Sequence, residues 1–261
     1  MARFILVRLL CLLLPFSAHA QGVPASNPQA VALVKASVTA MGGSQTTAAP
    51  QDSTATANVT VTASSSVEQG TMTTTTRGLD QTSEEISLPS GVQRLVFSQG
   101  SSNDKRPGAG PGEDPFSYEL SLSAQSPMFP LPWLASRMAS ADTAVVNLGN
   151  ETLSNVTSTH LRLTNTFTSA PDLALYSTFT VAHVWLDPTG LPLRIGYERR
   201  SALGDSPVVA VAYEYSDYRN VQGFLYPFQI RKFVNGTPWA SISVQTVQFN
   251  TGLSSADFSL Q

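Results

Sequence analysis

The 261-residue sequence contains one cysteine, three lysines and three histidines. Its cysteine, Cys11, lies close to the N-terminus, so the chain beyond it has no disulfide bond and no thiolate chemistry. Charged residues make up only 13% of the chain, and 18 acidic side chains outnumber 15 basic ones. Nucleic acid is therefore not an expected partner, because its phosphates favour a basic protein face. Beyond the first twenty residues no apolar run reaches about 18 residues, so no stable membrane span is expected in the mature chain.

The first twenty residues have the pattern of a cleavable signal peptide. Arg3 and Arg8 give a positive start, 9–14 form a short apolar core, and Ala18-His19-Ala20 is a small-x-small cleavage box. We expect a signal peptide over 1–20, cleavage after Ala20, and a periplasmic or secreted protein over 21–261. That mature chain carries 13 basic and 18 acidic side chains, a net charge of −5.

Two segments of the mature chain have helical periodicity. Val31, Val34, Val38 and Met41 form one apolar stripe after Asn27-Pro28, which predicts a helix over 28–41. A second short helix is predicted over 132–140, where Leu and Met residues repeat at helical spacing. Both helices are amphipathic, so each must cover an apolar surface.

Most of the remaining chain alternates between apolar and polar residues and predicts about eleven strands, with turns such as 187–190 and 235–236 between them. We interpret 100–115, which is rich in Gly and Pro, as an exposed loop. Strands joined by short turns are antiparallel neighbours, and one sheet of this size curls. The prediction is a single, mainly β (α+β) domain over 21–261, a large curved antiparallel sheet with its concave face covered by the helices. The expected strands cover 55–63, 72–77, 84–88, 92–97, 144–148, 160–167, 178–186, 191–199, 208–215, 224–234 and 239–249.

The sequence offers little reactive chemistry. Only His160 and His183 remain after cleavage of the leader, with no metal-ligand spacing, and we interpret them as structural or surface residues. No GxSxG motif occurs, and the paired Glu84 and Glu85 point to opposite faces of a strand. We therefore predict no catalytic residue, no metal site, no cofactor and no enzymatic activity.

Apolar side chains are the resource that remains. Several of the later strands place apolar residues on one face, which favours a hydrophobic cleft for an acyl chain or a similar ligand. An ordinary filled core explains the same alternation, so the pattern alone leaves both alternatives open. The candidate cleft residues are Val181, Trp185, Ile195, Tyr197, Val209, Val211, Tyr213, Ile230, Ile242 and Val244.

Four stretches of the sequence resemble a known family. They are the hairpin VWLDPTGLPLR at 184–194, the run YSDYRNVQG at 215–223 with Tyr226-Pro227 after it, the C-terminal 250–258, and the first helix ending in AMGG at 40–43. Together they resemble the periplasmic carriers of the outer-membrane lipoprotein-sorting pathway. The resemblance implies an unclosed β-barrel with helices lidding a hydrophobic cavity that takes lipoprotein acyl chains. Relatives also serve as periplasmic stress sensors. No motif places a functional residue of the carriers here, so none is transferred.

Two functional hypotheses follow, and a third, a hydrolase, would require a nucleophile or acid/base set that the sequence does not show. The first is an exported, non-enzymatic protein that binds a lipid or a lipoprotein acyl chain in the cleft of the half-barrel, in lipoprotein or lipid trafficking. The second is an envelope structural or sensory protein on the same fold with a filled core, whose partner is another envelope protein.

Overall fold

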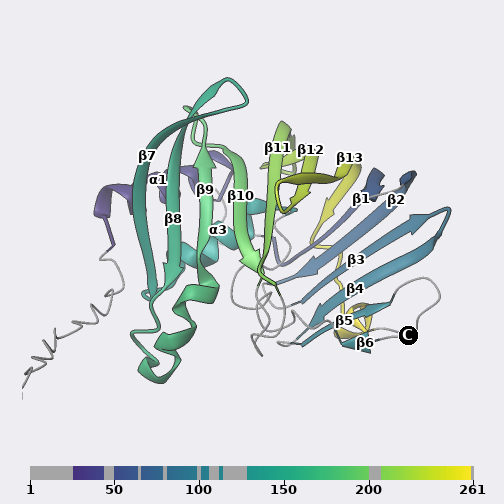
Figure 1. Cartoon of the computed structure of the whole chain (residues 1–261), viewed down its shortest axis with the longest axis horizontal. Helices are drawn as coiled ribbons and strands as arrows, with labels where there is room; N and C mark the ends of the chain where they lie inside the picture. The colour runs from purple at the N-terminus through teal and green to yellow at the C-terminus, as the bar shows by residue number, and fades with distance from the viewer. Residues whose placement is uncertain are drawn as a thin grey trace, which may run out of the picture.

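The computed structural model describes residues 26–43, 50–63, 66–78, 81–98, 101–105, 112–113, 128–199 and 207–259. The predicted leader over 1–20 lies outside them. Within the described residues, thirteen strands form one antiparallel sheet that does not close (Figure 1). The elements are α1 (Pro28–Ala40), β1 (Asp52–Ala63), β2 (Ser66–Arg77), β3 (Gln81–Leu88), β4 (Gly91–Ser98), β5 (Ser101–Lys105), β6 (Gly112–Glu113), α3 (Pro130–Ala139), β7 (Thr143–Leu153), β8 (Val156–Asn165), η1 (Pro171–Thr180), β9 (Ala182–Leu186), β10 (Pro192–Arg199), β11 (Val209–Val221), β12 (Phe224–Val234), β13 (Thr237–Phe249) and η2 (Ser255–Phe258).

The strand order is β6-β5-β4-β3-β2-β1-β13-β12-β11-β10-β9-β8-β7. Every neighbouring pair is also adjacent in sequence except β1 and β13, which pair from Ser53 with Phe249 to Val61 with Ala240. The two edges are β6 and β7, and the chain between them contains α3. The sheet is therefore an unclosed barrel whose open seam separates β6 from β7. This architecture confirms the predicted curved antiparallel sheet.

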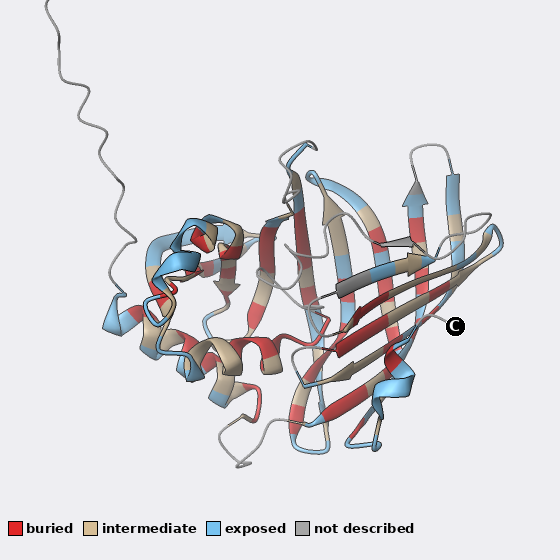
Figure 2. Ribbon diagram, turned by 90° about the horizontal axis from the view of Figure 1, so that it is seen from below, coloured by how far each residue is buried: buried red, intermediate tan, exposed pale blue. Residues whose placement is uncertain are grey.

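One face of the sheet, here called the inner face, forms the apolar core with α1 and α3. Both helices lie behind β7 to β10 in Figure 1, and Figure 2 shows buried segments on the helices and along many of the strands. Strand residues of this face, such as Val184, Ile195 and Ile242, belong to one buried cluster with Val34 of α1 and Leu134 of α3. The opposite side of the strands is called the outer face. Alternation along each strand decides which side chains each face receives.

Helix α1 is tied to the sheet by backbone hydrogen bonds at both ends. Its N-cap residue Asn27 accepts bonds from the amides that follow and donates its own amide to the Val145 carbonyl of β7, at 2.8 Å. At the other end the amide of Leu225, in β12, donates to the Met41 carbonyl at 3.0 Å. These bonds fix α1 across the sheet from β7 to β12.

The end of α1 also explains the glycine at position 42. Gly42 has φ +99°, and a Cβ atom there would lie 2.4 Å from the Gly223 carbonyl oxygen of the β11–β12 turn. Only a residue without a side chain permits both the left-handed backbone and this close approach.

Gly42→Ala is therefore expected to lower the free energy of unfolding by more than the ~1–2 kcal/mol that a left-handed backbone alone costs an alanine. The matched control is Gly236→Ala, because Gly236 has φ +76° but no atom within 4 Å of the added Cβ. Denaturant unfolding of the two variants measures the difference, and equal losses would contradict the close contact.

Asp52 holds the C-terminal segment against the start of β1. Its buried carboxylate accepts bonds from the amides of Thr251, Gly252 and Leu253, at 2.6, 3.0 and 3.2 Å, and from the Thr251 hydroxyl at 2.9 Å. Burial raises the pKa of this carboxyl, but the hydrogen bonds outweigh that effect and leave the pKa below its ordinary value.

Because the pKa of Asp52 is depressed in the folded state, its stabilising contribution is present above the ordinary carboxyl pKa of about 4 and is lost as the pH falls through the folded value. Asp52→Asn leaves at least one buried amide without an acceptor and is expected to cost about 1–3 kcal/mol at neutral pH. The stabilities of the two proteins should converge in acid. Urea unfolding as a function of pH tests this, with the exposed Asp172→Asn as the control. A difference in the free energy of unfolding that stays constant with pH would contradict this expectation.

Three local predictions differ from the structure. The expected loop over 100–115 contains β5, which pairs with β4 from Arg94 with Lys105 to Ser98 with Ser101. Its sequence, SSNDK, is polar throughout and gives no apolar alternation. β6 also falls in this loop, so the sheet has more strands than the predicted eleven. Residues 178–180, predicted as strand, end the 3₁₀ helix η1, which opens on Pro171.

Among the described residues, no helix is both long and apolar enough to cross a bilayer.

Candidate functional site

The ten candidate cleft residues divide between the two faces of the sheet. On the inner face seven are buried, with exposed fractions from 0% for Ile195 to 6% for Tyr197, and all seven belong to the apolar core. Val209 is partly buried and packs against the same core. Val181 and Trp185 have the opposite alternation and belong to the outer face. The buried seven are Ile195, Tyr197, Val211, Tyr213, Ile230, Ile242 and Val244.

The inner face is closed by α3 as well as by α1. Leu131, Trp133 and Leu134 of α3 are buried, with exposed fractions of 0–5%, and Phe129 stacks on Phe249 of β13 at 5.3 Å. Among the described residues no backbone hydrogen bond joins α3 to a strand. The packing of α3 on the sheet thus involves apolar side chains, whereas α1 is also held by backbone hydrogen bonds to strands.

One cation accompanies these apolar groups. Arg137, in the last turn of α3, lies over the Trp133 ring at 5.4 Å. Burial lowers the pKa of Arg137 to about 10, so the guanidinium stays charged at neutral pH. The inner face also carries buried tyrosines, and burial raises the pKa of Tyr213 and Tyr215 well above their ordinary value, so both phenols stay neutral.

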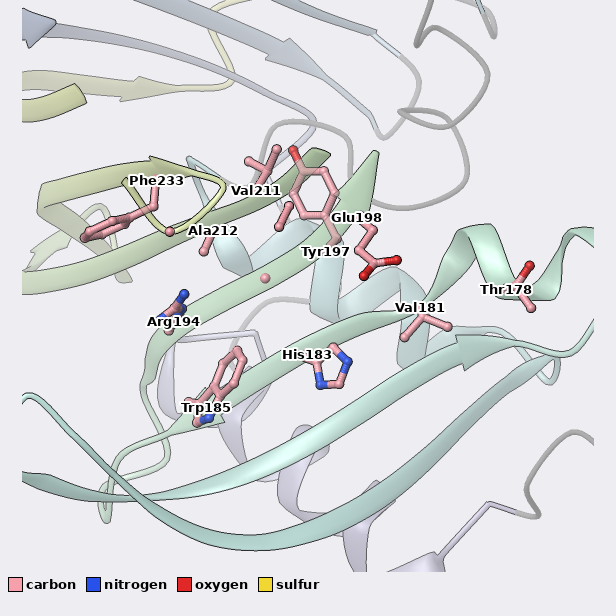
Figure 3. A pocket seen from close by; sticks show the side chains of 13 residues that line it. Thr178, Val181, His183, Trp185, Arg194, Tyr197, Glu198, Val211, Ala212 and Phe233 are labelled. Atoms are coloured by element: carbon pink, nitrogen blue, oxygen red, sulfur yellow. The ribbon is translucent and has the colours of Figure 1, made fainter. Parts of the chain in front are cut away.

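The outer face holds a pocket of about 420 Å³ over β9, β10 and β11 (Figure 3). Its lining includes Gly196, Ala210 and Ala212, which have no side chain beyond a methyl group. Gly196 pairs with Ala212 across the ladder, so the small residues are neighbours on one face. Trp185 of β9 and Phe233 of β12 stand on either side of them. Of the candidate cleft residues, four line this pocket: Val181, Trp185, Tyr197 and Val211.

A chain of hydrogen bonds leads into the pocket from β7. The Glu151 carboxylate bonds Nδ1 of His160 at 2.7 Å, and Nε2 of His160 bonds Nδ1 of His183 at 2.8 Å. The indole of Trp185 donates to the other oxygen of Glu151 at 2.9 Å, and its ring stacks on His160 at 4.2 Å. His183 lines the pocket. The two histidines of the mature chain therefore act as one unit, which we call the Glu151–His160–His183 chain.

Hydrogen bonds and burial set the charges in this chain. The bonds from Trp185 and His160 hold the pKa of Glu151 below its ordinary value. Burial lowers the pKa of His183, and the nearby charge of His160 adds to that effect. At neutral pH the unit therefore contains a carboxylate and an uncharged His183.

Arg194 closes the end of the pocket beside Trp185. Its guanidinium lies 5.3 Å from the Trp185 ring and 5.8 Å from the Phe233 ring. It also lies 3.6 Å from Glu214, which bonds Arg231 at 2.5 Å. Two cations thus share one carboxylate, which leaves this end of the pocket positive. Glu214 and Arg231 also line a second hollow of about 390 Å³, beside the tip of the β7–β8 hairpin.

Sequence reasoning placed His183 and Trp185 on one face but did not bring His160 to them. The β8–β9 pairing does so, because it sets His160 opposite Trp185 and Arg162 opposite His183. The connection between β8 and β9 contains the whole of η1, so no short turn in the sequence predicts this pairing. Among the described residues, no three carboxylate, imidazole or thiol groups converge as a metal site.

The chain is similar in structure to several solved proteins. A LolA superfamily protein from Nitrosomonas europaea superposes with a TM-score of 0.52 and 14% identity, over 88% of this chain and 97% of that one. The chain has the LolA-like fold. A domain from Vibrio parahaemolyticus, provisionally assigned as an outer membrane lipoprotein-sorting protein, matches at a TM-score of 0.51 and 14% identity, over 88% and 96% of the two chains. A DUF1329 family protein from Desulfovibrio piger matches at a TM-score of 0.50 and 14% identity, over 88% and 97%.

These comparisons confirm the resemblance that the sequence motifs indicated, at the level of the fold. No family model matches the sequence, and the search of curated proteins finds no similar sequence. The LolA-like fold is thus recognisable in the arrangement of strands and helices where overall sequence similarity is too low to show it.

Proposed function

We propose that this LolA-like protein is exported through its leader and binds a lipid or a lipoprotein acyl chain on the inner face of the half-barrel, without performing chemistry. The observation that carries the proposal is the way in which α3 packs on the inner face. This helix covers an apolar face through Leu131, Trp133 and Leu134, and no backbone hydrogen bond between described residues joins it to a strand. An acyl chain offers the sheet the same kind of contact and can replace the helix side chains.

The energies of the two occupants are comparable. Burying one of the three α3 side chains contributes on the order of 1.5–3 kcal/mol. An acyl chain contributes ~0.8 kcal/mol per methylene, on the order of ten kcal/mol for sixteen carbons before ordering costs. Exchange between a closed state, with α3 seated, and a loaded state is therefore feasible. A seated α3 also keeps the apolar face away from water when no ligand is present.

The test begins with the full-length protein expressed with its leader in a bacterial host. Purified protein is extracted with organic solvent and the extract is analysed by mass spectrometry, and delipidated protein is titrated with a fluorescent fatty acid. Co-purified lipid, or saturable uptake at one site, supports the proposal. Protein that carries no lipid and takes up no probe would contradict it. Sequencing of the mature N-terminus tests cleavage after Ala20 in the same preparation.

The second candidate, a structural or sensory envelope protein with a filled core, is favoured by the burial of seven of the predicted cleft residues at 0–6% exposure. It expects no lipid in the extract and no uptake of the fatty acid. It also expects the protein to be captured with another envelope protein after crosslinking in cells. The lipid measurements therefore separate the two candidates directly.

A further inference from the structure

The pocket on the outer face is formed by an unusual distribution of side-chain sizes. Three small residues, Gly196, Ala210 and Ala212, lie together on β10 and β11, while Trp185 and Phe233 stand beside them. The result is a shallow floor with aromatic walls, and its volume of about 420 Å³ falls in the ~300–1,000 Å³ range of small-molecule sites. A flat ring fits such a floor better than a branched group, because it contacts the backbone surface and the walls together.

The Glu151–His160–His183 chain fixes which nitrogen carries a proton. The Glu151 carboxylate only accepts, so Nδ1 of His160 carries the hydrogen of their bond. When His160 is neutral its Nε2 is an acceptor, and Nδ1 of His183 must donate to it. Neutral His183 then has its lone pair on Nε2. That nitrogen has no hydrogen-bond partner among the described residues, and the ring that carries it lines the pocket.

We propose that the outer-face pocket is a second ligand site, which binds a small flat apolar molecule through a hydroxyl or N–H group that donates a hydrogen bond to Nε2 of His183. The ring of the ligand lies over Gly196 and Ala212, between Trp185 and Phe233. His183, Trp185 and Gly196 of this site lie on the face of the sheet opposite to the inner face proposed for acyl chains, while Tyr197 and Val211, which also line the pocket, belong to the core of that inner face.

The same hydrogen bonds make the site selective with pH. One proton added to the histidine pair resides on either imidazole, and in both cases Nε2 of His183 then carries a hydrogen. The charged groups around the pair are Glu151 on β7, Arg162 on β8, and Arg194 and Glu198 on β10. In acid the pocket therefore presents a donor in place of an acceptor, and it favours a ligand with a carboxylate.

Three naphthalene probes of nearly equal shape test this in the full-length protein by calorimetry. 2-Naphthol has a donor, 2-methoxynaphthalene has none, and 2-naphthoate has a carboxylate. At about pH 7.5, 2-naphthol is expected to bind about five- to tenfold more tightly than the methyl ether, which is the ratio that one hydrogen bond supplies. As the pH falls through the pKa of His183, which burial lowers from its ordinary value, that preference should disappear and 2-naphthoate should bind most tightly. Equal binding of 2-naphthol and its methyl ether at pH 7.5, or no binding of any probe, would overturn the proposal.

Variants locate the binding. His183→Phe keeps a ring in place but has no acceptor, so the preference for 2-naphthol over the methyl ether should fall to about onefold. Ala212→Leu fills the floor and should weaken all three probes at least tenfold. Ile242→Trp, on the inner face, is the matched control and should leave naphthol binding unchanged, whatever it does to fatty-acid uptake. In the unmodified protein, ¹⁵N spectra of the imidazoles supply a second readout. 2-Naphthol must shift Nε2 of His183, and a ligand that leaves this signal unchanged is bound elsewhere.

Discussion

Leu134→Ala is expected to tighten the binding of an acyl ligand by tenfold or more, although it removes buried apolar surface. Leu134 is a fully buried residue of α3, and truncating such a leucine to alanine lowers the stability of the packed state by about 2–5 kcal/mol. That cost falls on the closed state, in which α3 is seated, and not on the loaded state, in which the ligand has replaced its side chains. Each 1.4 kcal/mol removed from the closed state raises the apparent affinity about tenfold. Titration with a fluorescent fatty acid measures the effect.

The matched control is Val34→Ala, which truncates a fully buried side chain of α1. It lowers the free energy of unfolding as well, but α1 remains tied to β7 and β12 by the bonds of Asn27 and Met41. Its affinity for the fatty acid should therefore stay close to that of the original protein. If both variants gain affinity equally, the gain comes from a general loss of stability and not from the release of α3. If Leu134→Ala binds the fatty acid no better than the original protein, the hypothesis that the ligand displaces α3 is wrong.

Local signals in the sequence predicted the elements well. The cap at Asn27-Pro28 and the glycines after Met41 set the ends of α1 to within a residue, because capping depends on nearby residues only. α3 begins two residues earlier than predicted, since Pro130 is tolerated in the first turn. The pairing of β1 with β13 joins segments almost two hundred residues apart, and no local pattern encodes such a pair. The sequence does not predict β5, because its residues, SSNDK, are all polar and show no apolar alternation although the strand pairs with β4 and β6.

The candidate site was predicted less completely, for a geometrical reason. Alternation shows which residues of a strand share a face, and it grouped Val181, His183 and Trp185 correctly. It does not show which face receives the helices, so Trp185 was assigned to the same cleft as Ile195 although the two lie on opposite sides of the sheet. The meeting of His160 with His183 requires the β8–β9 register, which depends on the fold of the whole half-barrel.

Ile242→Trp is expected to abolish fatty-acid binding, with a loss of more than tenfold. Ile242 is 2% exposed, lies opposite Ile230 on the inner face and belongs to the apolar core of the face proposed for the acyl chain. A tryptophan there occupies space that the chain needs when α3 is displaced. Overpacking of this kind costs about 1–3 kcal/mol of stability, which a folded domain can tolerate. Val244→Phe is a smaller enlargement on the same face and replaces the variant if Ile242→Trp does not fold.

Ser241→Trp supplies the comparison, since it adds the same side chain one residue earlier on β13 and therefore on the outer face. Ser241 is exposed, so this variant should fold normally and bind the fatty acid as the original protein does. Loss of binding in both variants would show that the tryptophan acts through stability. Unchanged binding in Ile242→Trp would remove the inner face as the acyl site and leave the filled core of a structural or sensory protein. Because the two residues are adjacent in sequence, only the face of the sheet differs between the two experiments.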